Sequence, residues 1–355
     1  MSFLDHPEFI FQKNAYFAAA NTHRGFVSYF SPLFDAYPKY VIKGGPGCGK
    51  STLMKKIAKA AEKKGLAVTY YFCSSDTDSL DAVAIPERGI VVLDGTPPHA
   101  VEPKYPGAFD RLIDLTAFWD HTILQSNVNE IAALSGEIQK NYQKVYALMQ
   151  AIVSLENVID TATASAFDHD HAAKIITRLL EKRHTEEAKK PSITYRPASA
   201  FGVKGYLHFN SYETSAETIY QIKDRIVYSE YFFKQLQKLL TQKKISYILS
   251  PRPLDEKTES IYLPKERILF TRLTCCQETS GMINLDRLLP SRGKGALLGH
   301  KSLLREIDTL CLNIQKILHR IGQAHDELES YYITATDYLA LNQFSEQFIS
   351  SLFTV

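Results

Sequence analysis

The stretch that most constrains this chain runs from Lys39 to Ile57. A short apolar segment comes first, a turn with four glycines follows at residues 44–49, and an amphipathic helical pattern begins near Lys50. Because glycine has no Cβ, such a turn can adopt positive φ angles and bring its N–H groups close to a bound anion. The free N–H groups at the start of the helix add partial positive charge. The sequence therefore predicts a strand, an anion-binding turn and a helix in succession.

The spacing of Gly44, Gly49, Lys50 and Ser51 fits the phosphate-loop (Walker A) pattern, and the flanking strand and helix supply the context that this pattern requires. We expect Lys50 to reach the β- and γ-phosphates of a nucleoside triphosphate, and the Ser51 hydroxyl to ligate Mg²⁺. The predicted nucleotide-binding residues are Gly44, Gly45, Pro46, Gly47, Cys48, Gly49, Lys50, Ser51 and Thr52. The alternative is a glycine-rich turn with a chance lysine, which the flanking strand and helix disfavour.

Two further strands are predicted at residues 67–73 and 89–94. The second ends in Asp94 after four apolar residues, which is the Walker B pattern of a buried strand that brings one carboxylate to Mg²⁺. An ordinary strand-end turn is the alternative. Residue 95 is Gly, whereas many motor-like ATPases carry a catalytic Glu there, so the sequence leaves the water-activating base unassigned.

Three polar residues at the same edge of the predicted sheet are candidates for that role. Asp76 and Asp78 follow the strand at 67–73 and could hold a Mg²⁺-bound water or accept a proton, with turn capping as the alternative. His99 follows Asp94 and could sense the γ-phosphate, although a lone histidine is more often a structural group. Within the turn, Cys48 is either a thiol of lowered pKa that oxidation could block or a tolerated small residue.

The sequence turns helical from about residue 111 to 184 and again from about 296 to 350. Apolar residues spaced by threes and fours from Val128 to Ile159 indicate a heptad-like seam, and a second helix is expected to return along the first at 172–183. The functional interpretation is a pair of arms that contact a protein partner. The alternative is a helical layer packed on the protein's own sheet, and both remain open.

The second half of the chain repeats the first in diverged form. Residues 40–43 match 220–223 and residues 85–92 match 263–270 at nearly the same offset, which argues for internal duplication. The counterpart of the glycine-rich turn is residues 224–231, which contain neither glycine nor lysine. Asp94 corresponds to Arg272. We therefore predict one nucleotide site, in the N-terminal half.

The domain organisation follows from this repeat. We predict a P-loop domain over residues 1–190, a charged linker at about 184–200 and a degenerate repeat over residues 191–355, each domain with its helical arm. A length of 355 residues with 45% hydrophobic residues is enough for two sizeable cores.

The composition of the chain indicates which partners and which cellular compartment to expect. A net charge of +2 gives no basic field for nucleic acid, and five cysteines without metal-ligand spacing suit a reducing compartment. The start shows no leader pattern and no apolar run is long enough to span a membrane, so we expect a cytoplasmic protein. The sequence leaves the oligomeric state open.

The phosphate loop, the Walker B strand and the repeated layout resemble the P-loop nucleoside triphosphatases, with full motif agreement over residues 40–94. The wider pattern, which includes residues 21–26, 73–76 and 94–99, resembles a largely uncharacterised bacterial family of ATPases built as two P-loop halves. The resemblance implies an α/β fold with a duplicated parallel sheet, and ATP and Mg²⁺ as cofactors. In that family the second half can carry its own phosphate loop, so residues 224–231 depart from the pattern.

Three functions remain in view. The first is a Mg²⁺-dependent ATPase whose γ-phosphate contacts switch the arms or the two halves. The second is a small-molecule or nucleotide kinase in which Asp76 serves as the base for an acceptor hydroxyl, although no arginine-rich lid stands out. The third is a nucleotide-gated scaffold with little turnover, which the Gly at residue 95 and the degenerate second half favour.

Overall fold

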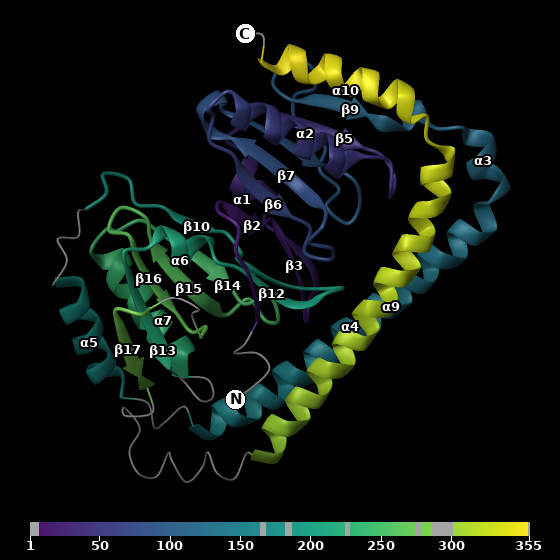
Figure 1. Cartoon of the computed structure of the whole chain (residues 1–355). Helices are drawn as coiled ribbons and strands as arrows, with labels where there is room; N and C mark the ends of the chain where they lie inside the picture. The colour runs from purple at the N-terminus through teal and green to yellow at the C-terminus, as the bar shows by residue number, and fades with distance from the viewer. Residues whose placement is uncertain are drawn as a thin grey trace.

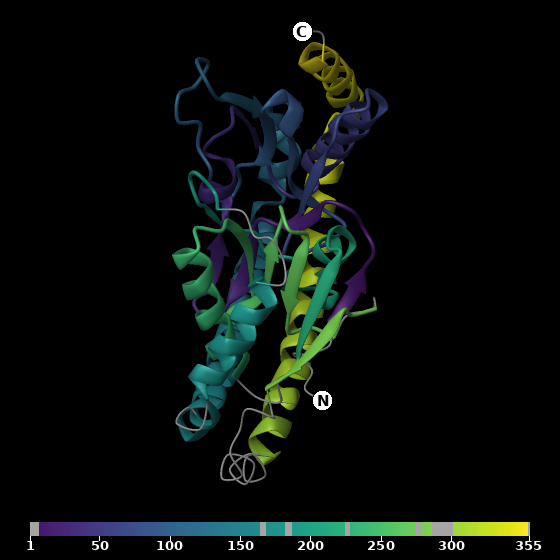
Figure 2. The same cartoon turned by 90° about the vertical axis from the view of Figure 1, so that its left-hand side faces the viewer.

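The computed structural model describes residues 7–163, 168–181, 187–223, 228–274, 278–285 and 301–353. The fold is mixed α/β: two six-stranded sheets stand beside a pair of long helices, α4 (Val128–Thr163) and α9 (Lys301–Ala335), that run side by side (Figures 1 and 2). We call the first sheet with the helices packed on it the first unit, and the second sheet with its helices the second unit.

The first sheet has the strand order β2-β6-β7-β8-β5-β9. Its strands are β2 (Ala15–Phe17), β5 (Lys39–Lys43), β6 (Thr69–Phe72), β7 (Leu80–Ile85), β8 (Ile90–Asp94) and β9 (Arg111–Asp114). Strand β5 pairs in parallel with β8 and β9, whereas β7 runs antiparallel to both β6 and β8. The parallel sheet predicted from the sequence is therefore a mixed one, because β7 fills a segment that the sequence analysis treated as a connection.

Helix α2 (Lys50–Lys63) follows β5 across the glycine-rich turn, as predicted. Its apolar face is buried against the sheet, and the lysines that follow Lys50 lie on the opposite side, the division that amphipathic patterning requires. The buried residues of this face are Leu53, Met54, Ile57, Ala58 and Ala61. The chain turns away at Gly65, which has a φ of +74° that favours glycine.

The second sheet has the strand order β10-β14-β15-β16-β13-β17, which matches the first position by position. Its strands are β10 (Ile193–Tyr195), β13 (Thr218–Lys223), β14 (Tyr247–Pro251), β15 (Thr258–Leu263), β16 (Ile268–Thr271) and β17 (Gly281–Asn284). The directions of pairing match as well, with β15 antiparallel between β14 and β16. Helix α7 (Tyr228–Gln242) follows β13 as α2 follows β5.

Each unit also has a small hairpin with glycine at its turn. The hairpin of β3 (Ala19–Thr22) and β4 (Gly25–Ser28) turns at Gly25, with a φ of +101°. The hairpin of β11 (Ser199–Gly202) and β12 (Gly205–Phe209) turns at Gly205, with a φ of +103°. The shorter helical elements are α1 (Phe30–Phe34), η2 (Pro86–Arg88), η3 (Leu115–Phe118), α3 (His121–Ser126) and α6 (Ser211–Ser215).

The long helices differ from the predicted arms in how they are paired. Helix α4 packs along α9, and their shared core includes Val145, Met149, Ile314 and Leu318. Helix α5 (His169–Glu181) packs against α7 instead of returning along α4, so the predicted hairpin of α4 and α5 is wrong. The first arm also starts later than predicted, because residues 111–118 form β9 and a 3₁₀ turn.

The two units exchange elements at both ends of the described chain. Strand β1 (Glu8–Ile10) pairs in parallel with β12 of the second unit. Helix α10 (Tyr338–Phe353) turns back from α9 and packs on α2, where Leu341 and Phe353 join the core of the first unit (Figure 1). The second part of the predicted linker at 184–200 is not a linker, because it supplies β10 and the start of β11.

Several expectations concern residues outside the described ranges. These include residues 224–227 of the glycine-free counterpart, Cys275, Cys276 and the expected start of the second arm at 296–300. In the part of the chain that the structure describes, every helix is too short or too polar to cross a lipid bilayer.

Candidate functional site

The glycine-rich loop, residues 44–49, joins the end of β5 to the start of α2. Gly47 has a φ of +67° and Gly49, the residue before α2, a φ of +87°, a backbone region that glycine adopts without strain. A Cβ on Gly44 would lie 2.5 Å from Sγ of Cys48, so the loop curls too tightly for a side chain there. The predicted strand, turn and helix are therefore present with the geometry that the glycines favour.

Lys50 extends its side chain along the inside of this loop. Its Nζ donates hydrogen bonds to the carbonyl oxygens of Gly44 and Gly45, at 3.0 and 2.6 Å. It also lies 3.6 Å from Oδ2 of Asp94, and both side chains are mostly buried, with 11% and 14% exposed. The lysine ammonium and the Asp94 carboxylate therefore share one small region at the mouth of the loop.

Asp94 reaches this region because β8 lies beside β5. The two strands pair in parallel with Ile42 opposite Asp94, so the carboxylate leaves the sheet where the glycine-rich loop begins. Oδ1 of Asp94 accepts hydrogen bonds from the backbone N–H and the hydroxyl of Thr96. Burial raises the pKa of Asp94, although Lys50 and Thr96 oppose the shift. No sequence motif predicts this role for Thr96.

Ser51 contacts the strand on the other side of β8, which is β7. Its Oγ accepts a hydrogen bond of 3.0 Å from the backbone N–H of Leu80, the first residue of β7. Because a hydroxyl oxygen has two lone pairs, Oγ keeps the capacity for another contact. The structure thus places Lys50 3.6 Å from Asp94, with Ser51 next to Lys50 at the start of α2.

His99 lies close to this cluster through a residue that sequence analysis passed over. Its Nε2 is 3.1 Å from Oδ2 of Asp81, and only 5% of each side chain is exposed. Burial opposes protonation of His99, but the negative charges of Asp81 and Asp94 outweigh it and raise the pKa of His99. The imidazole stacks on Phe30 with ring centroids 4.5 Å apart. A carboxylate opening an otherwise apolar strand, as in residues 80–85, is the sequence signal for Asp81.

Asp76 and Asp78 lie in the turn between β6 and β7. Oδ1 of Asp76 accepts from the N–H of Asp78 at 3.0 Å, and Oδ2 accepts from the hydroxyl of Ser79 at 3.1 Å. The Asp78 carboxylate is 75% exposed and pairs with Lys204 at 2.6 Å. Within the described residues, no hydrogen bond or ion pair joins either aspartate to the cluster of Lys50 and Asp94. The contacts of Asp76 are those of a residue that caps a turn, which was the alternative to a role in Mg²⁺ binding or proton transfer.

The environment of Cys48 does not favour the reactive thiol of lowered pKa that was one of the two predictions for this residue. Its side chain is buried beside Gly44, and burial raises the pKa of the thiol although Lys50 opposes the shift. The lowered pKa is therefore wrong for Cys48. A raised pKa disfavours the thiolate and with it redox control of the loop.

The outer side of the glycine-rich loop is covered by α9 and α10, a contact that no local pattern predicts. A Cβ on Gly45 would lie 2.8 Å from the ring of Tyr332, and one on Gly47 would lie 3.0 Å from the Glu329 carbonyl. The hydroxyl of Tyr338 donates a hydrogen bond of 2.9 Å to the carbonyl of Gly47. These glycines are therefore required both by the backbone turn and by the approach of two helices.

The junction between α9 and α10 is tied to the segment that leads into α4. The N–H of Asp120 donates to the carbonyl of Ala335 at 2.7 Å, and the N–H of Asp337 donates to the carbonyl of Phe118 at 2.8 Å. Farther along α4, the hydroxyl of Tyr142 donates to Oγ of Ser75, just past β6. Both long helices thus contact segments at the edge of the sheet that carries the loop.

Arg272, the counterpart of Asp94, lies among acids of the second unit. Its N–H donates to the carbonyl of Glu259 at 3.1 Å. Burial raises the pKa of both Asp255 and Glu259; Arg252 is the main opposing charge at Asp255 and His208 at Glu259, and Arg272 adds a smaller lowering effect at each. For Asp255 the net result is a lowered pKa of about 2, whereas burial prevails at Glu259 and the pKa is raised.

Comparison with known proteins gives one result. A family model described as Nephrocystin 3, N-terminal, matches residues 35–85, a stretch that runs from the end of α1 through the glycine-rich loop to the end of β7. That family is associated with NTPase-like proteins. No curated protein and no solved structure matches the chain. The chain is therefore similar to an NTPase-associated domain over the segment that holds Lys50 and Ser51.

Proposed function

We propose that this chain binds ATP and Mg²⁺ at the glycine-rich loop and hydrolyses the nucleotide. The observation that carries the proposal is the convergence of Lys50, Ser51 and Asp94 at one end of the sheet, with Nζ of Lys50 3.6 Å from Asp94. A cation, a hydroxyl and a carboxylate around a loop of positive-φ glycines form the set of groups that phosphate and Mg²⁺ require. The similarity of residues 35–85 to an NTPase-associated domain adds support.

The residues present fit such a ligand. Lys50 donates to two loop carbonyls, contacts that an ammonium can exchange for phosphate oxygens by rotation of its flexible stem. Ser51 and Asp94 would hold Mg²⁺, which supplies charge neutralisation at the phosphates when bound. His99, whose pKa Asp81 raises against the effect of burial, would contact the γ-phosphate in its protonated form, because a buried cation next to the cluster favours an anionic partner.

We propose further that the chain arose by duplication and kept one nucleotide site. Two sheets of identical strand order, each with a glycine-turned hairpin directly after its first strand in the chain, support this view. The counterpart of Asp94 is Arg272, a cation whose charge acts on the nearby acids Glu259 and Asp255. A cation in that position does not suit Mg²⁺, so the second unit would serve as a scaffold for the first.

A second candidate function, a nucleotide-gated switch with slow turnover, is favoured by the packing of α9 and α10 on the loop. Glycines 45 and 47 leave no room for a side chain between the loop and Tyr332 or Glu329. A nucleotide that shifts the loop would therefore shift the end of α9, and α4 with it, since the two helices share a core. The arms are then the surface that a protein partner would contact.

Calorimetry with ATP and Mg²⁺ tests the site. Lys50→Ala should abolish detectable ATP binding, whereas Lys59→Ala, on an exposed position of the same helix, should leave the affinity unchanged. Undiminished affinity in Lys50→Ala would rule out the proposed site. Free phosphate released by the wild-type protein then separates hydrolysis from gating: turnover below about one per hour supports the switch.

A further inference from the structure

The two units contact each other through the turns of their hairpins, and the contacts are reciprocal. We call the hairpin of β3 and β4 the first hairpin and that of β11 and β12 the second hairpin. The N–H of Val203, in the second hairpin, donates to the carbonyl of Ser75, between β6 and β7, at 2.8 Å. The N–H of His23, in the first hairpin, donates to the carbonyl of Leu254, between β14 and β15, at 3.0 Å. Contacts of this kind are typical of the interface of a twofold dimer.

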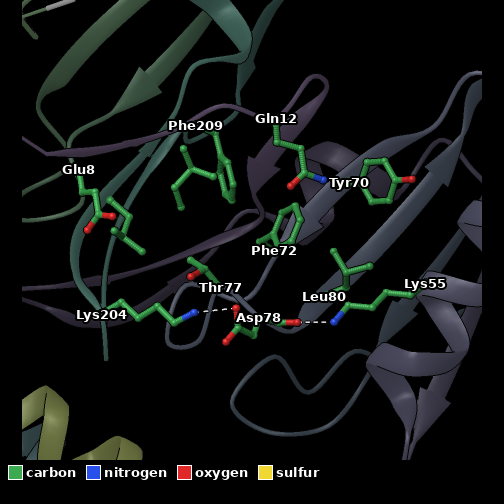
Figure 3. Close-up of a pocket in the computed structure, with 12 residues that line it drawn as sticks. Glu8, Gln12, Lys55, Tyr70, Phe72, Thr77, Asp78, Leu80, Lys204 and Phe209 are labelled. Atoms are coloured by element: carbon green, nitrogen blue, oxygen red, sulfur yellow. Dashed lines mark hydrogen bonds and ion pairs between the residues drawn. The ribbon is translucent and has the colours of Figure 1, made fainter. Parts of the chain in front are cut away.

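A pair of salt bridges repeats the pattern. Lys204, just before the turn glycine of the second hairpin, pairs with Asp78 of the first unit at 2.6 Å, in the crevice between the units (Figure 3). Arg24, just before the turn glycine of the first hairpin, pairs with Glu256 of the second unit. The side chains of Lys204 and Arg24 are 47% and 64% exposed. Because pairs this exposed contribute little to the stability of a fold, changing either one tests position more than stability.

The second hairpin fits closely between the turn that joins β6 to β7 and the long helices. A Cβ on Gly202 would lie 2.7 Å from the carbonyl oxygen of Ser75. On the side of α9, a Cβ on Gly322 would lie 3.2 Å from the side chain of Val203. The hydroxyl of Tyr142, on α4, donates to Oγ of Ser75 at 2.8 Å. The position of this turn therefore depends on the second hairpin and on the pair of long helices.

The same turn leads directly to the candidate nucleotide site. The carbonyl of Asp78 accepts a hydrogen bond from Nζ of Lys55, on α2 (Figure 3). Two residues farther along, the N–H of Leu80 donates to Oγ of Ser51 at 3.0 Å. Asp78, which Lys204 contacts, is thus joined to α2 on one side and to the contact of Ser51 on the other. A shift of the second hairpin would therefore shift the hydroxyl that is expected to ligate Mg²⁺.

The reciprocal contacts in the second unit end at a different kind of residue. Leu80 is the first residue of β7, and Thr258 is the first residue of β15. The N–H of Thr258 donates to Oε2 of Glu230 at 3.2 Å, in the first turn of α7. Glu230 belongs to residues 224–231, the counterpart of the glycine-rich loop without its glycines and lysine. The same series of contacts thus reaches a predicted nucleotide-binding residue only in the first unit.

We propose that the second unit regulates the nucleotide site through the second hairpin, with Lys204 as a positioning residue for Ser51. The inference rests on the proposed binding of ATP and Mg²⁺ at the glycine-rich loop. With the second hairpin seated on the turn between β6 and β7, Leu80 and Lys55 hold the start of α2, and Ser51 is in place to contact the metal. When the hairpin lifts, Ser51 loses this support and the Mg²⁺ complex of ATP binds more weakly. Because coupling between two sites is reciprocal, the bound nucleotide in turn favours the seated hairpin.

The test measures the affinity of the full chain for ATP by calorimetry, with Mg²⁺ and in EDTA. Lys204→Asp turns the attraction to Asp78 into a repulsion and should weaken binding in Mg²⁺ about threefold, the range of an exposed pair. Gly202→Ala places a Cβ against the Ser75 carbonyl and should weaken it about tenfold. In EDTA both variants should bind as the wild type does, because Lys50 and the loop are unchanged. Lys204→Arg, which keeps the charge, should bind normally under both conditions.

Arg24→Asp is the matched control, because it inverts the reciprocal salt bridge, on the side where the contacts end at Glu230. It should leave the affinity for ATP unchanged. Hydrogen exchange at the Leu80 amide supplies a second measurement that needs no nucleotide. Exchange should be about threefold faster in Lys204→Asp and unchanged in Arg24→Asp, since only the first loosens the hydrogen bond to Ser51. Equal melting temperatures show that the folds of the variants are intact.

The inference is overturned if Lys204→Asp binds ATP in Mg²⁺ as the wild type does, or if Arg24→Asp weakens binding by the same factor. A loss of equal size in Mg²⁺ and in EDTA also overturns it, because the contact of Ser51 with the metal is then not what changed. Absence of ATP binding by the wild-type protein contradicts the proposed function instead. The exchange of the Leu80 amide then still decides whether the second hairpin positions the contact to Ser51.

Discussion

The hydroxyl of Tyr338 donates a hydrogen bond to the carbonyl oxygen of Gly47 across 2.9 Å, although the two residues are 291 positions apart. Gly47 has a positive φ, so this bond fixes the orientation of a peptide unit that glycine alone would leave free. The next N–H groups of the loop are the ones expected to face phosphate. An α10 side chain thus holds the backbone of the candidate nucleotide site.

Tyr338→Phe should weaken ATP binding about fivefold. The change removes one hydrogen bond, worth about 1 kcal/mol, that keeps the loop in its ordered conformation. Calorimetry with ATP and Mg²⁺ measures the affinity. Tyr331→Phe, which removes a hydroxyl from the neighbouring helix α9, serves as the control, and equal affinities in the two variants would contradict the role of Tyr338.

Gly45→Ala should destabilise the fold by about 1–2 kcal/mol and reduce ATP affinity, because the new Cβ would lie 2.8 Å from the Tyr332 ring. Tyr332 also packs on Trp119, so its ring cannot move freely. Combining Gly45→Ala with Tyr332→Ala should cost less than the two single changes added together, as urea denaturation of all three variants would measure.

Gly136→Ala is the control for this experiment. A Cβ there meets nothing within 4 Å, and the position lies inside α4, so alanine should leave stability unchanged or raise it by about 1 kcal/mol. If Gly45→Ala behaves in the same way, the contact between α9 and the loop is not needed for stability.

Asp81→Asn should remove a stabilisation that depends on pH. The pKa of His99 is raised in the folded protein by Asp81, so the stabilisation is fully present below the unfolded pKa of 6.5 and is lost as pH rises through the folded value. The difference in melting temperature between wild type and Asp81→Asn should therefore be larger at about pH 6 than at about pH 9. Asp78→Asn, an exposed carboxylate, should show no such trend, and a constant difference for Asp81→Asn would disprove the pairing.

Glu156→Gln should destabilise the chain by about 2 kcal/mol. Glu156, on α4, is 7% exposed and accepts hydrogen bonds from both terminal nitrogens of Arg252, a buried residue that follows β14. Asp255 still pairs with Arg252 in the variant, so the loss is that of a charged hydrogen bond and not of an orphaned cation. Glu130→Gln, exposed on the same helix, should cost nothing measurable by urea denaturation.

Local patterns predicted the elements around the glycine-rich loop well. Helix α2 begins at Lys50, where the helical pattern was predicted to start, and strand β8 (Ile90–Asp94) lies within one residue of the predicted 89–94, because a glycine or a charged residue marks each boundary. Strand β7 was missed. Its apolar run follows a cluster of Ser and Asp, which is typical of a connection, and precedes Pro86.

The partners of the long helices could not be predicted in the same way. The seam from Val128 to Ile159 identifies which face of α4 is apolar, but α9 and a hairpin with α5 would bury that face equally well. Glu156, an apparent break in the seam, is where α4 contacts Arg252 of the second unit. The packing of α4 on α9 and the ion pair of Glu156 with Arg252 both join residues far apart in the sequence, so the local sequence of α4 does not predict either of them.

The candidate site shows the same limit. Lys50, Ser51 and Asp94 come together because the motif fixes two of them and strand pairing brings the third alongside. Asp81 lies within the apolar run 80–85, and its carboxylate reaches His99 because this run forms the antiparallel strand β7. Asp76, which was expected at the same edge of the sheet, instead accepts hydrogen bonds within its own turn.

The packing of α10 on α2 has a consequence for biosynthesis. Residues of α2 leave the ribosome early, but Leu341 and Phe353, which share their core, are translated far later. Until then the apolar surface that α10 covers stays open to solvent, to chaperones and to nucleotide. The glycine-rich loop and α2 are therefore synthesised first, and α10 can pack on them only after the whole second unit has been synthesised.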